Sequence, residues 1–281
     1  MQSTGTLYIV ATPIGNLQDI TLRALDVLQS CDMIMAEDTR HSRVLLEQHG
    51  ISNKVVALHE HNERAKADGL VAQLSQGAKI ALISDAGTPL ISDPGYPLVR
   101  ACRQAGVAVV PVPGASAVIT ALSAAGLPTD RFMFIGFLAA KAGARQSQLS
   151  ALMDEAATTV FYESPRRLLD TLNAMQDTMG PEREVVVARE LTKQFETFLS
   201  GTLASVIEQV STDSNQQRGE IVIMLHGARR DPDAVPAAAE QLLRLLSAQL
   251  PLKKAAAVVA EHYGLRKNQL YQLGLSWQSA D

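Results

Sequence analysis

Short apolar runs alternate with amphipathic segments throughout the first half of the chain, and this alternation constrains the fold more than any other feature. The apolar runs have strand length and end in turn residues, at 7–11, 33–36, 55–58, 80–83 and 107–112. The segments between them have helix length, at 21–29, 41–48, 64–76 and 97–105. Such alternation predicts an α/β fold with a mostly parallel sheet covered by helices on both faces. Ligands of such sheets bind at the carboxyl ends of the strands.

A second group of strand-like runs follows a break at 126–130, where the sequence reads Gly-Leu-Pro-Thr-Asp. These runs lie at 132–137, 158–162, 184–188, 198–201 and 221–225, with less regular spacing, which leaves one antiparallel pair open. Residues 141–148, KAGARQSQ, have the composition of a mobile surface loop, either plainly solvated or serving as a lid or substrate contact. We therefore expect two α/β domains, at 1–126 and 127–230.

The last segment, residues 236–281, follows a connector rich in Pro, Asp and Arg at 227–236. It contains three predicted helices, at 237–248, 252–263 and 266–275, and the last two have helix–turn–helix spacing. Within 252–281 the basic residues outnumber the acidic pair Glu261 and Asp281, and they are Lys253, Lys254, Arg266 and Lys267. The whole chain has a net charge of −4, which excludes coating of nucleic acid through bulk charge. This small helical module is either a packing cap with solvated lysines or an RNA-contacting module.

Several classes of protein are excluded by what the sequence lacks. No run approaches the roughly 18 apolar residues that span a bilayer, and we expect no signal peptide because the first residues show no basic region or cleavage site. The two cysteines, Cys31 and Cys102, are expected to be buried thiols in a reducing cytoplasm. His59 and His61 have no third ligand nearby in the sequence, so we expect no bound metal. Neither GxGxxG nor GxxxxGK(S/T) occurs, which argues against hydride transfer and P-loop nucleotide hydrolysis.

The stretch at 81–95, ALISDAGTPLISDPG, carries the strongest signal for a ligand site. It leaves a strand abruptly and holds two turn signals in succession, which shape the backbone rather than bury side chains. It also contains two carboxylates, Asp85 and Asp93, and no basic residue, so it suits polyphosphate poorly. A cationic ligand fits better, such as one with the sulfonium and ammonium groups of S-adenosylmethionine. Asp93-Pro94-Gly95 is expected to turn the chain into the next helix.

Two further loops also follow strands. Residues 11–21 hold Pro13 and Gly15, which let the backbone approach a ligand, or they form a simple turn into a helix. Residues 111–117 read PVPGASA, where Ser116 either caps the next helix or contacts a ligand that Gly114 admits. Each loop taken alone leaves both interpretations open.

Together the three loops resemble the tetrapyrrole methylase superfamily, also called class III methyltransferases. TPIGNLQDIT, AEDTR, SDAGTPLISDPG and VPGASA are similar to motifs of the branch that 2′-O-methylates a cytidine of small-subunit (16S) ribosomal RNA, in the decoding region. FYESPRRL, ARELTKQFE, RGEIVIML and LPLKKAAAVVAEHYGLRKNQLY extend the resemblance over nearly the whole chain. Tetrapyrrole-modifying members usually carry a GxGPGD-like first loop and lack the terminal helical module. Here ATPIGN stands in place of that loop, which moves the expected substrate from tetrapyrroles to RNA.

The resemblance implies that S-adenosylmethionine lies folded in a cleft between the two α/β domains of a homodimeric enzyme. Carried over by motif, the implied cofactor contacts are Pro13, Ile14, Gly15, Asp85, Gly87, Thr88, Ile91, Ser116, Ala117, Tyr162, Ala188 and Glu220. Among them Gly87, Thr88 and Ile91 form one wall, and Asp85 lies near the cationic end. The implied reaction is an in-line transfer of the methyl group to a ribose 2′-hydroxyl, with 16S rRNA of the small subunit as the partner.

Polar clusters at strand ends supply candidates for the remaining roles. Lys193 with Glu190 is the candidate base with its orienting group, because a hydroxyl nucleophile gains from a positioned base. Candidate RNA contacts, several of them guanidinium groups that pair bidentately with phosphate, are Arg40, His59, Arg166, Arg167, Lys253, Lys254, Arg266 and Lys267. Each strand-end cluster is alternatively a solvated strand end with a helix cap. Two other functions stay open: methylation of a tetrapyrrole or other small acid, and a non-catalytic RNA-binding assembly role.

Overall fold

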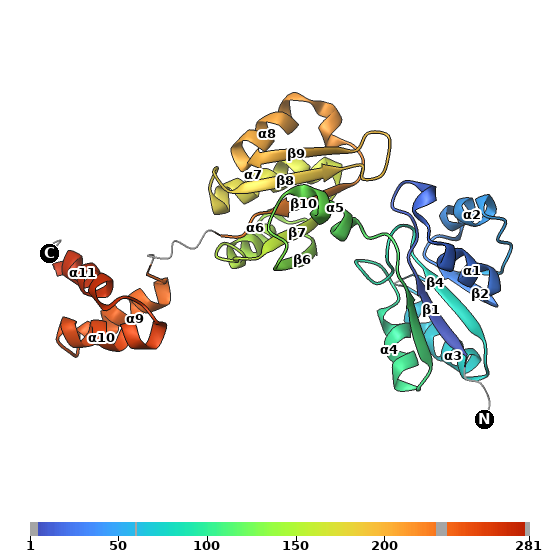
Figure 1. Cartoon of the computed structure of the whole chain (residues 1–281), viewed down its shortest axis with the longest axis horizontal. Coiled ribbons are helices and arrows are strands. Elements are labelled where there is room, and N and C mark those ends of the chain that lie inside the picture. Colours follow the sequence, from blue (N-terminus) through green and yellow to red (C-terminus); the bar gives the residue numbers. More distant parts are fainter. Residues whose placement is uncertain (1–4, 60, 229–234, 279–281) are drawn as a thin grey trace. The chain divides into compact units, whose positions relative to one another are not determined.

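The chain divides into two compact units, Met1–Ala228 and Arg229–Asp281, in a computed structural model that describes residues 5–59, 61–228 and 235–278 (Figure 1). The first unit carries two five-stranded sheets, and the second contains helices. Across the described residues, no helix is both long enough and apolar enough to cross a membrane.

The first sheet has the strand order β3-β2-β4-β1-β5, and each neighbouring pair is parallel. Its strands are β1 (Thr6–Val10), β2 (Met33–Ala36), β3 (Val55–Ala57), β4 (Lys79–Ile83) and β5 (Ala108–Val112). The helices between them are α1 (Leu22–Ser30), α2 (Thr39–Gln48), α3 (Glu63–Ser75) and α4 (Tyr96–Gln104). Two separate apolar clusters pack around this sheet, one including Leu7, Leu74 and Leu98 and the other Leu28 and Leu46. The predicted α/β architecture is therefore confirmed.

Strand order explains why loops far apart in the sequence meet. β1 lies between β4 and β5, so the loops that follow these three strands emerge at one edge of the sheet. The parallel register aligns the strand ends, with Ile9 opposite Leu82 and Val10 opposite Val112. The three loops that the sequence singled out are therefore neighbours in space.

The second sheet has the order β6-β7-β10-β8-β9. Its strands are β6 (Phe132–Phe137), β7 (Thr158–Glu163), β8 (Glu184–Arg189), β9 (Thr197–Thr202) and β10 (Ile221–Leu225). Only β6 and β7 pair in parallel among these neighbours, so antiparallel pairing goes beyond the single pair that the sequence left open. The accompanying helices are α5 (Ala117–Ala125), α6 (Ala142–Ala151), α7 (Leu168–Met179) and α8 (Leu203–Thr212).

Helix α5 follows directly on β5 of the first sheet but packs against the second. Its residues Val118 and Leu122 share an apolar cluster with Val160 of β7 and Val222 of β10, and Figure 1 shows α5 beside β10. Ile14, from the loop after β1, belongs to the same cluster. The two sheets are therefore joined by apolar packing as well as by the chain. The domain boundary at 126 stays a prediction.

The surface loop predicted at 141–148 is wrong, because these residues form most of α6. Arg145 and Leu149, one helical turn apart, are its buried residues. On an exposed position, Gln146 Nε2 donates to the Thr178 hydroxyl of α7 at 2.8 Å. One of the two buried residues is an arginine, so the segment shows too few apolar positions for the helical period to be read.

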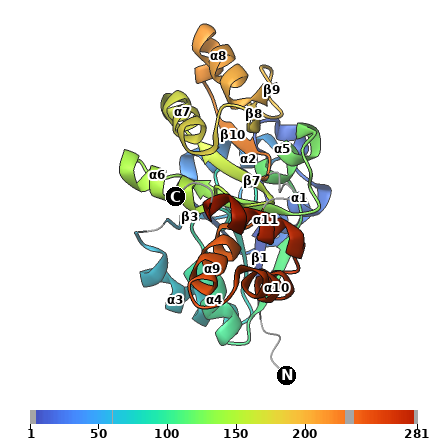
Figure 2. The same ribbon diagram turned by 90° about the vertical axis from the view of Figure 1, so that its left-hand side faces the viewer.

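The second unit contains α9 (Ala237–Ser247), α10 (Leu252–Tyr263) and α11 (Lys267–Gln278) (Figure 2). Leu243, Val259 and Leu270, one from each helix, are fully buried in its core. Gly264 ends α10 with a φ of +66°, in the left-handed region that lets the chain turn sharply into α11. The predicted terminal helical module is confirmed, and it has its own core.

Candidate functional site

Hydrogen bonds tie the loops after β1, β4 and β5 to one another. Thr12 and Gly87 form a two-way main-chain bridge, at 2.9 Å from Thr12 N to Gly87 O and 3.0 Å from Gly87 N to Thr12 O. The Thr88 hydroxyl donates to the Ala115 carbonyl at 2.9 Å. Gly114 permits close packing of the third loop on the first, because a Cβ at Gly114 would lie 2.8 Å from the Ala11 Cβ. The three loops therefore form one fixed layer.

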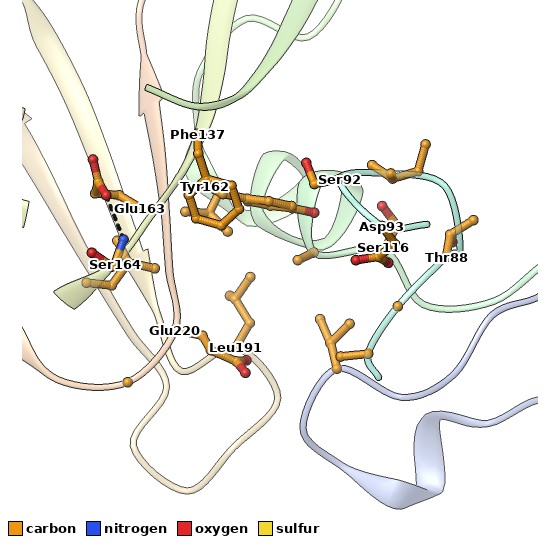
Figure 3. Close-up of a pocket in the computed structure, with 18 of the residues that line it drawn as sticks. Thr88, Ser92, Asp93, Ser116, Phe137, Tyr162, Glu163, Ser164, Leu191 and Glu220 are labelled. Atoms are coloured by element: carbon orange, nitrogen blue, oxygen red, sulfur yellow. Dashed lines mark hydrogen bonds between the residues drawn. The ribbon is translucent and has the colours of Figure 1, made fainter. Parts of the chain in front are cut away.

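A cavity of about 370 Å³ lies between this layer and the end of the second sheet (Figure 3). That volume falls within the range of roughly 300–1,000 Å³ found for small-molecule sites. Of the predicted cofactor contacts, the cavity brings together Ile14, Gly87, Thr88, Ile91, Ser116, Ala117, Tyr162 and Glu220. We call it the first cavity.

The first cavity is acidic and partly aromatic. Asp93, Glu163 and Glu220 line it, and the described lining residues include no lysine, arginine or histidine. Phe137 and Tyr162 meet edge to face with their ring centroids 5.7 Å apart. Carboxylates attract a cation, and aromatic edges and faces suit a planar ring. The lining therefore favours a ligand that combines positive charge with a flat apolar part.

Asp93 faces the cavity, so its expected role as only a turn residue before the next helix was incomplete. Burial, opposed by a hydrogen bond with Ser84 and aided by the charge of Asp85, raises the pKa of Asp93 to about 6. Burial and then the Asp93 charge also raise the pKa of Tyr162, to about 12. Figure 3 shows the Tyr162 hydroxyl pointing toward Asp93. Above about pH 6, the Asp93 carboxylate therefore places a negative charge at the cavity wall.

Ser116 precedes α5 but makes no capping hydrogen bond with its side chain. Its hydroxyl instead lies at the cavity, close to Asp93 and Thr88 in Figure 3. Ser116 therefore occupies the N-cap position without a capping side chain, and its contact with a ligand stays a prediction. Gly87, at a φ of +77°, turns the chain where any side chain would be strained.

Glu163 is a buried carboxylate at the far wall, and the sequence marks it only as part of a polar cluster at a strand end, with Arg166. It accepts from the Thr171 hydroxyl at 2.6 Å and from Ser164 N at 2.7 Å, and its side chain lies 3.4 Å from the Arg167 guanidinium. Arg167 also donates to the carbonyls of Leu138 and Ala139. These contacts fix the guanidinium within the wall, so the structure does not support Arg167 as a phosphate contact. Arg166 beside it is exposed.

The sequence analysis also did not name Phe137 as a site residue. Its position at the end of a strand is the signal that could have identified it. Phe137 ends β6 and Glu163 ends β7, two neighbouring parallel strands of the second sheet. Strand ends were searched for charged clusters, which overlooks an aromatic side chain. Applying the strand-end rule to all residue types, and not to charged ones alone, would have found Phe137.

A second cavity of about 350 Å³ adjoins the first. Ile14, Ala86 and Glu220 line both cavities. Three predicted cofactor contacts, Pro13, Gly15 and Asp85, line the second rather than the first, together with Leu17, His41, Val44, Leu45 and Lys193. Asp85 therefore does not line the cavity in which the cationic end of the cofactor was expected. Ala188 lines neither cavity, because it is fully buried in β8.

Of the predicted catalytic pair, Lys193 lines the second cavity, and Glu190 lies beside Lys193 but lines neither cavity. Lys193 Nζ lies 3.0 Å from a carboxylate oxygen of Glu190 and 3.0 Å from one of Glu220. Burial acts to lower the pKa of Lys193, but its hydrogen bonds to Glu190 and Glu220 outweigh burial and raise it. A lysine held as ammonium has no lone pair to accept a proton. These contacts argue against Lys193 as the base and favour it as a charged positioning group.

The turn that carries Glu190 and Lys193 follows β8 and is hydrogen-bonded to the loop after β1. Glu190 and Thr192 have φ values of +53° and +65°, which are uncommon for residues other than glycine and costly for a β-branched one. The Thr192 hydroxyl accepts from Asn16 N at 3.0 Å. A Cβ at Gly15 would lie 2.6 Å from Lys193 Cγ and 2.9 Å from the Leu191 carbonyl. Gly15 is therefore required for the turn to approach the loop.

The other predicted RNA contacts are placed as follows. Arg40 pairs with Asp38 at 2.9 Å, with its side chain 89% exposed. His59 meets His61 edge to face at 5.9 Å, and neither lines the two cavities. No group of three or more potential metal ligands occurs in the described residues. The remaining four predicted contacts, Lys253, Lys254, Arg266 and Lys267, are all exposed and lie in the second unit.

Known proteins are similar to this chain over nearly its whole length. Residues 6–207 match the family described as tetrapyrrole (corrin/porphyrin) methylases, and residues 233–278 match the RsmI C-terminal HTH domain. A Pasteurella multocida (strain Pm70) protein named ribosomal RNA small subunit methyltransferase I is 55% identical over 273 residues, covering 97% of each chain. The Vibrio cholerae protein of that name is 57% identical over 270 residues, covering 96% of this chain and 94% of the other. The crystal structure of uroporphyrin-III-C-methyltransferase from Thermus thermophilus shares the fold, with a TM-score of 0.55 and 22% identity over 79% of this chain and 94% of that one.

Proposed function

The chain belongs to the tetrapyrrole methylase family, and from this we propose that it transfers a methyl group from S-adenosylmethionine to the 2′-hydroxyl of a cytidine in 16S ribosomal RNA. The observation that carries the proposal is the first cavity, which is acidic, partly aromatic and free of basic side chains in its described lining. The relatives named as small-subunit rRNA methyltransferases supply the class of substrate. The cytidine and its ribose oxygen come from the motif resemblance.

The residues present fit this cofactor. Asp93 and Glu220 offer negative charge to a sulfonium and an ammonium group, and Phe137 with Tyr162 offers an aromatic surface to an adenine ring. The Ser116 hydroxyl lies at the same cavity as a hydrogen-bonding group for a ribose or a carboxylate. When bound, the cofactor supplies a methyl group already activated as a sulfonium. The chain's task is then to hold the two reactants in line.

Positioning accounts for much of the catalysis in this scheme. Ile14, Ala86 and Glu220 line both cavities, so a methyl donor in the first meets a hydroxyl presented from the second at this shared wall. Well-oriented reactants reach effective molarities of about 10⁵ M or more. Lys193 holds the Glu220 carboxylate at 3.0 Å, which fixes one part of that wall. Transfer would leave S-adenosylhomocysteine, and the proton of the hydroxyl would pass to the Glu220 carboxylate at that wall or to water, while the ammonium of Lys193 offers a donor to an oxygen of the substrate.

The RNA partner is proposed to contact the second unit. Lys253 and Lys254 lie at the start of α10, and Arg266 and Lys267 lie at the turn into α11. Such residues bind phosphates in a salt-dependent way. An enzyme that modifies the small ribosomal subunit would act in the cytoplasm.

We also propose a homodimer, as the family resemblance implies. Large apolar side chains of the first unit are exposed, among them Ile119 (55%), Phe132 (43%) and Met133 (39%). A partner subunit would bury such side chains. Light scattering of the purified protein at micromolar concentration gives the mass, and a monomer at all concentrations contradicts this part of the proposal.

The central experiment incubates the protein with small ribosomal subunits and methyl-labelled S-adenosylmethionine. We expect label in 16S rRNA at one nucleotide that resists alkaline cleavage, as 2′-O-methylation requires. Tyr162→Ala should abolish cofactor binding and labelling, while Tyr96→Ala, at a 62% exposed tyrosine outside both cavities, should change neither.

Each alternative function gives a different result in the same assays. A folded protein that binds the cofactor but labels a tetrapyrrole and no RNA is a small-molecule methyltransferase. A protein that binds RNA but shows no heat of binding with the cofactor at high micromolar concentration is a non-catalytic assembly factor.

A further inference from the structure

We propose that the second cavity receives the base of the target nucleotide and that the Asp85 carboxylate recognises the exocyclic amino group of cytosine. The inference rests on the proposed function and adds to it a site and a residue for base selection. It concerns Asp85 because the structure places this residue at the second cavity, away from the first.

The position of the second cavity suits a substrate. It shares Ile14, Ala86 and Glu220 with the first cavity, so its contents lie one side chain away from a donor bound there. Enzymes that act on one nucleotide commonly swing it out of its stack into such a pocket. A base held in the second cavity would leave its ribose at the shared wall. A hydroxyl of that ribose is the group that the proposed reaction needs there.

The lining of the second cavity differs chemically from that of the first. Leu17, Val44 and Leu45 supply apolar surface for the faces of a planar base. His41 and Lys193 supply nitrogen donors, which the first cavity lacks among its described lining residues. The cytosine ring carries two acceptors, O2 and N3, and one exocyclic amine. A site with nitrogen donors and a carboxylate acceptor suits this pattern, and the other carboxylate of the lining, Glu220, lies at the wall shared with the first cavity.

Asp85 provides that acceptor. Its Oδ1 accepts from Asp38 N at 3.0 Å, which orients the carboxylate from the loop after β4 toward the start of α2. A carboxylate has about four lone-pair sites, so one main-chain bond leaves capacity for a ligand. Aspartate and glutamate characteristically accept from the N4 amine of cytosine. Uracil presents an oxygen at the same place, which a carboxylate repels, so Asp85 would select cytidine over uridine.

The test first maps the nucleotide that the wild-type protein methylates and then uses small subunits reconstituted with cytidine or uridine at that position. Asp85→Asn should lower kcat/KM on cytidine subunits about 10- to 100-fold. It should also lower the cytidine-to-uridine preference, because an amide can donate to the uracil oxygen. The Kd for S-adenosylmethionine should stay within about threefold, since the cofactor occupies the other cavity. Glu47→Gln, an exposed carboxylate on the same helix α2, is the matched control and should change none of these.

A second variant tests the cavity without touching a charged group. Val44 is 62% exposed at its rim, so Val44→Trp should fold and obstruct entry, raising KM for the subunit and leaving cofactor Kd unchanged. Leu22→Trp, at an 81% exposed position outside the cavity, is its control.

Three results would overturn the inference while the proposed function stands. They are an Asp85→Asn protein that loses cofactor affinity in step with activity, an unchanged cytidine preference, or a Val44→Trp protein with wild-type KM. A wild-type protein that binds the cofactor but labels no RNA instead refutes the proposed function, and this inference with it.

Discussion

At the scale of single residues, we expect Asp93 to make both cofactor affinity and folding stability depend on pH. Its pKa of about 6 lies above the value near 3.9 of an unfolded aspartate, because the folded protein buries it and places Asp85 nearby. A cationic ligand favours the ionised form. Affinity for S-adenosylmethionine should therefore rise between pH 5 and 7, by at most about tenfold per unit, and level off above. S-adenosylhomocysteine, which lacks the sulfonium charge, should show a weaker trend in titration calorimetry.

The same shift has a defined sign for stability. Between about pH 4 and 6 the folded protein binds more protons at Asp93 than the unfolded chain does, so this residue's contribution to stability falls as pH rises through that window. Asp93→Asn should remove this trend in melting temperature and in cofactor affinity. If the variant keeps the wild-type pH profile of affinity, Asp93 does not face the bound cation.

Glycine at position 15 makes a second residue-scale prediction. Gly15→Ala places a Cβ against the backbone carbonyl of Leu191 as well as the Thr192 and Lys193 side chains, so the turn must move away from the first loop. We expect lower stability in urea unfolding and at least a tenfold loss of methyl transfer, since misplacement by about 1 Å can cost roughly 10²-fold. Gly69→Ala, within α3 and with open space around it, is the control. It should be neutral or stabilising by up to about 1 kcal/mol.

At the scale of elements, mutations can test α6, the helix that the structure shows where the sequence predicted a surface loop. Leu149 is fully buried in the core of the second sheet, and Ser150 beside it is exposed. Leu149→Ala should lower the free energy of unfolding by about 2–5 kcal/mol, through lost transfer energy and the cavity left behind. Ser150→Ala should stay within about 0.5 kcal/mol of the wild type in the same denaturation experiment. A small effect at Leu149 would mean that this segment is the surface loop that its composition suggests.

The elements also show how far the sequence could go. Strands such as β2 and β10 were predicted at their observed bounds because a buried strand is a continuous apolar run. The directions of the strands in the second sheet were not predicted, because they depend on which strands pair across long connections. The loop layer of the site was predicted from Gly, Pro and carboxylate residues. Phe137 was not recognised because only charged strand ends were considered. Asp93 and Glu163 were noted as a turn residue and a strand-end carboxylate, but their place at one cavity follows from packing between two sheets.

At the scale of the whole molecule, the second unit predicts the salt dependence of RNA binding. Changing Lys253, Lys254, Arg266 and Lys267 together to alanine should weaken binding to small subunits and reduce the slope of log K against log salt by up to about three. Cofactor affinity should not change, because both cavities are lined by the first unit. Lys54→Ala, at an exposed lysine of the first unit, serves as the control in a filter-binding titration with KCl. An unchanged slope in the quadruple variant would assign RNA contact to other residues.

The packing of α5 has a consequence for the order in which the molecule matures during synthesis. This helix continues the loop that bears Ser116, yet its apolar face is covered by strands as late in the chain as β10. A growing chain that has emerged only through β5 therefore lacks the support that holds this loop in place. We expect stalled nascent chains ending before residue 221 to bind no S-adenosylmethionine, and chains with all of 1–228 outside the ribosomal tunnel to bind it. The capacity to modify ribosomes would then be acquired only near the end of the protein's own translation.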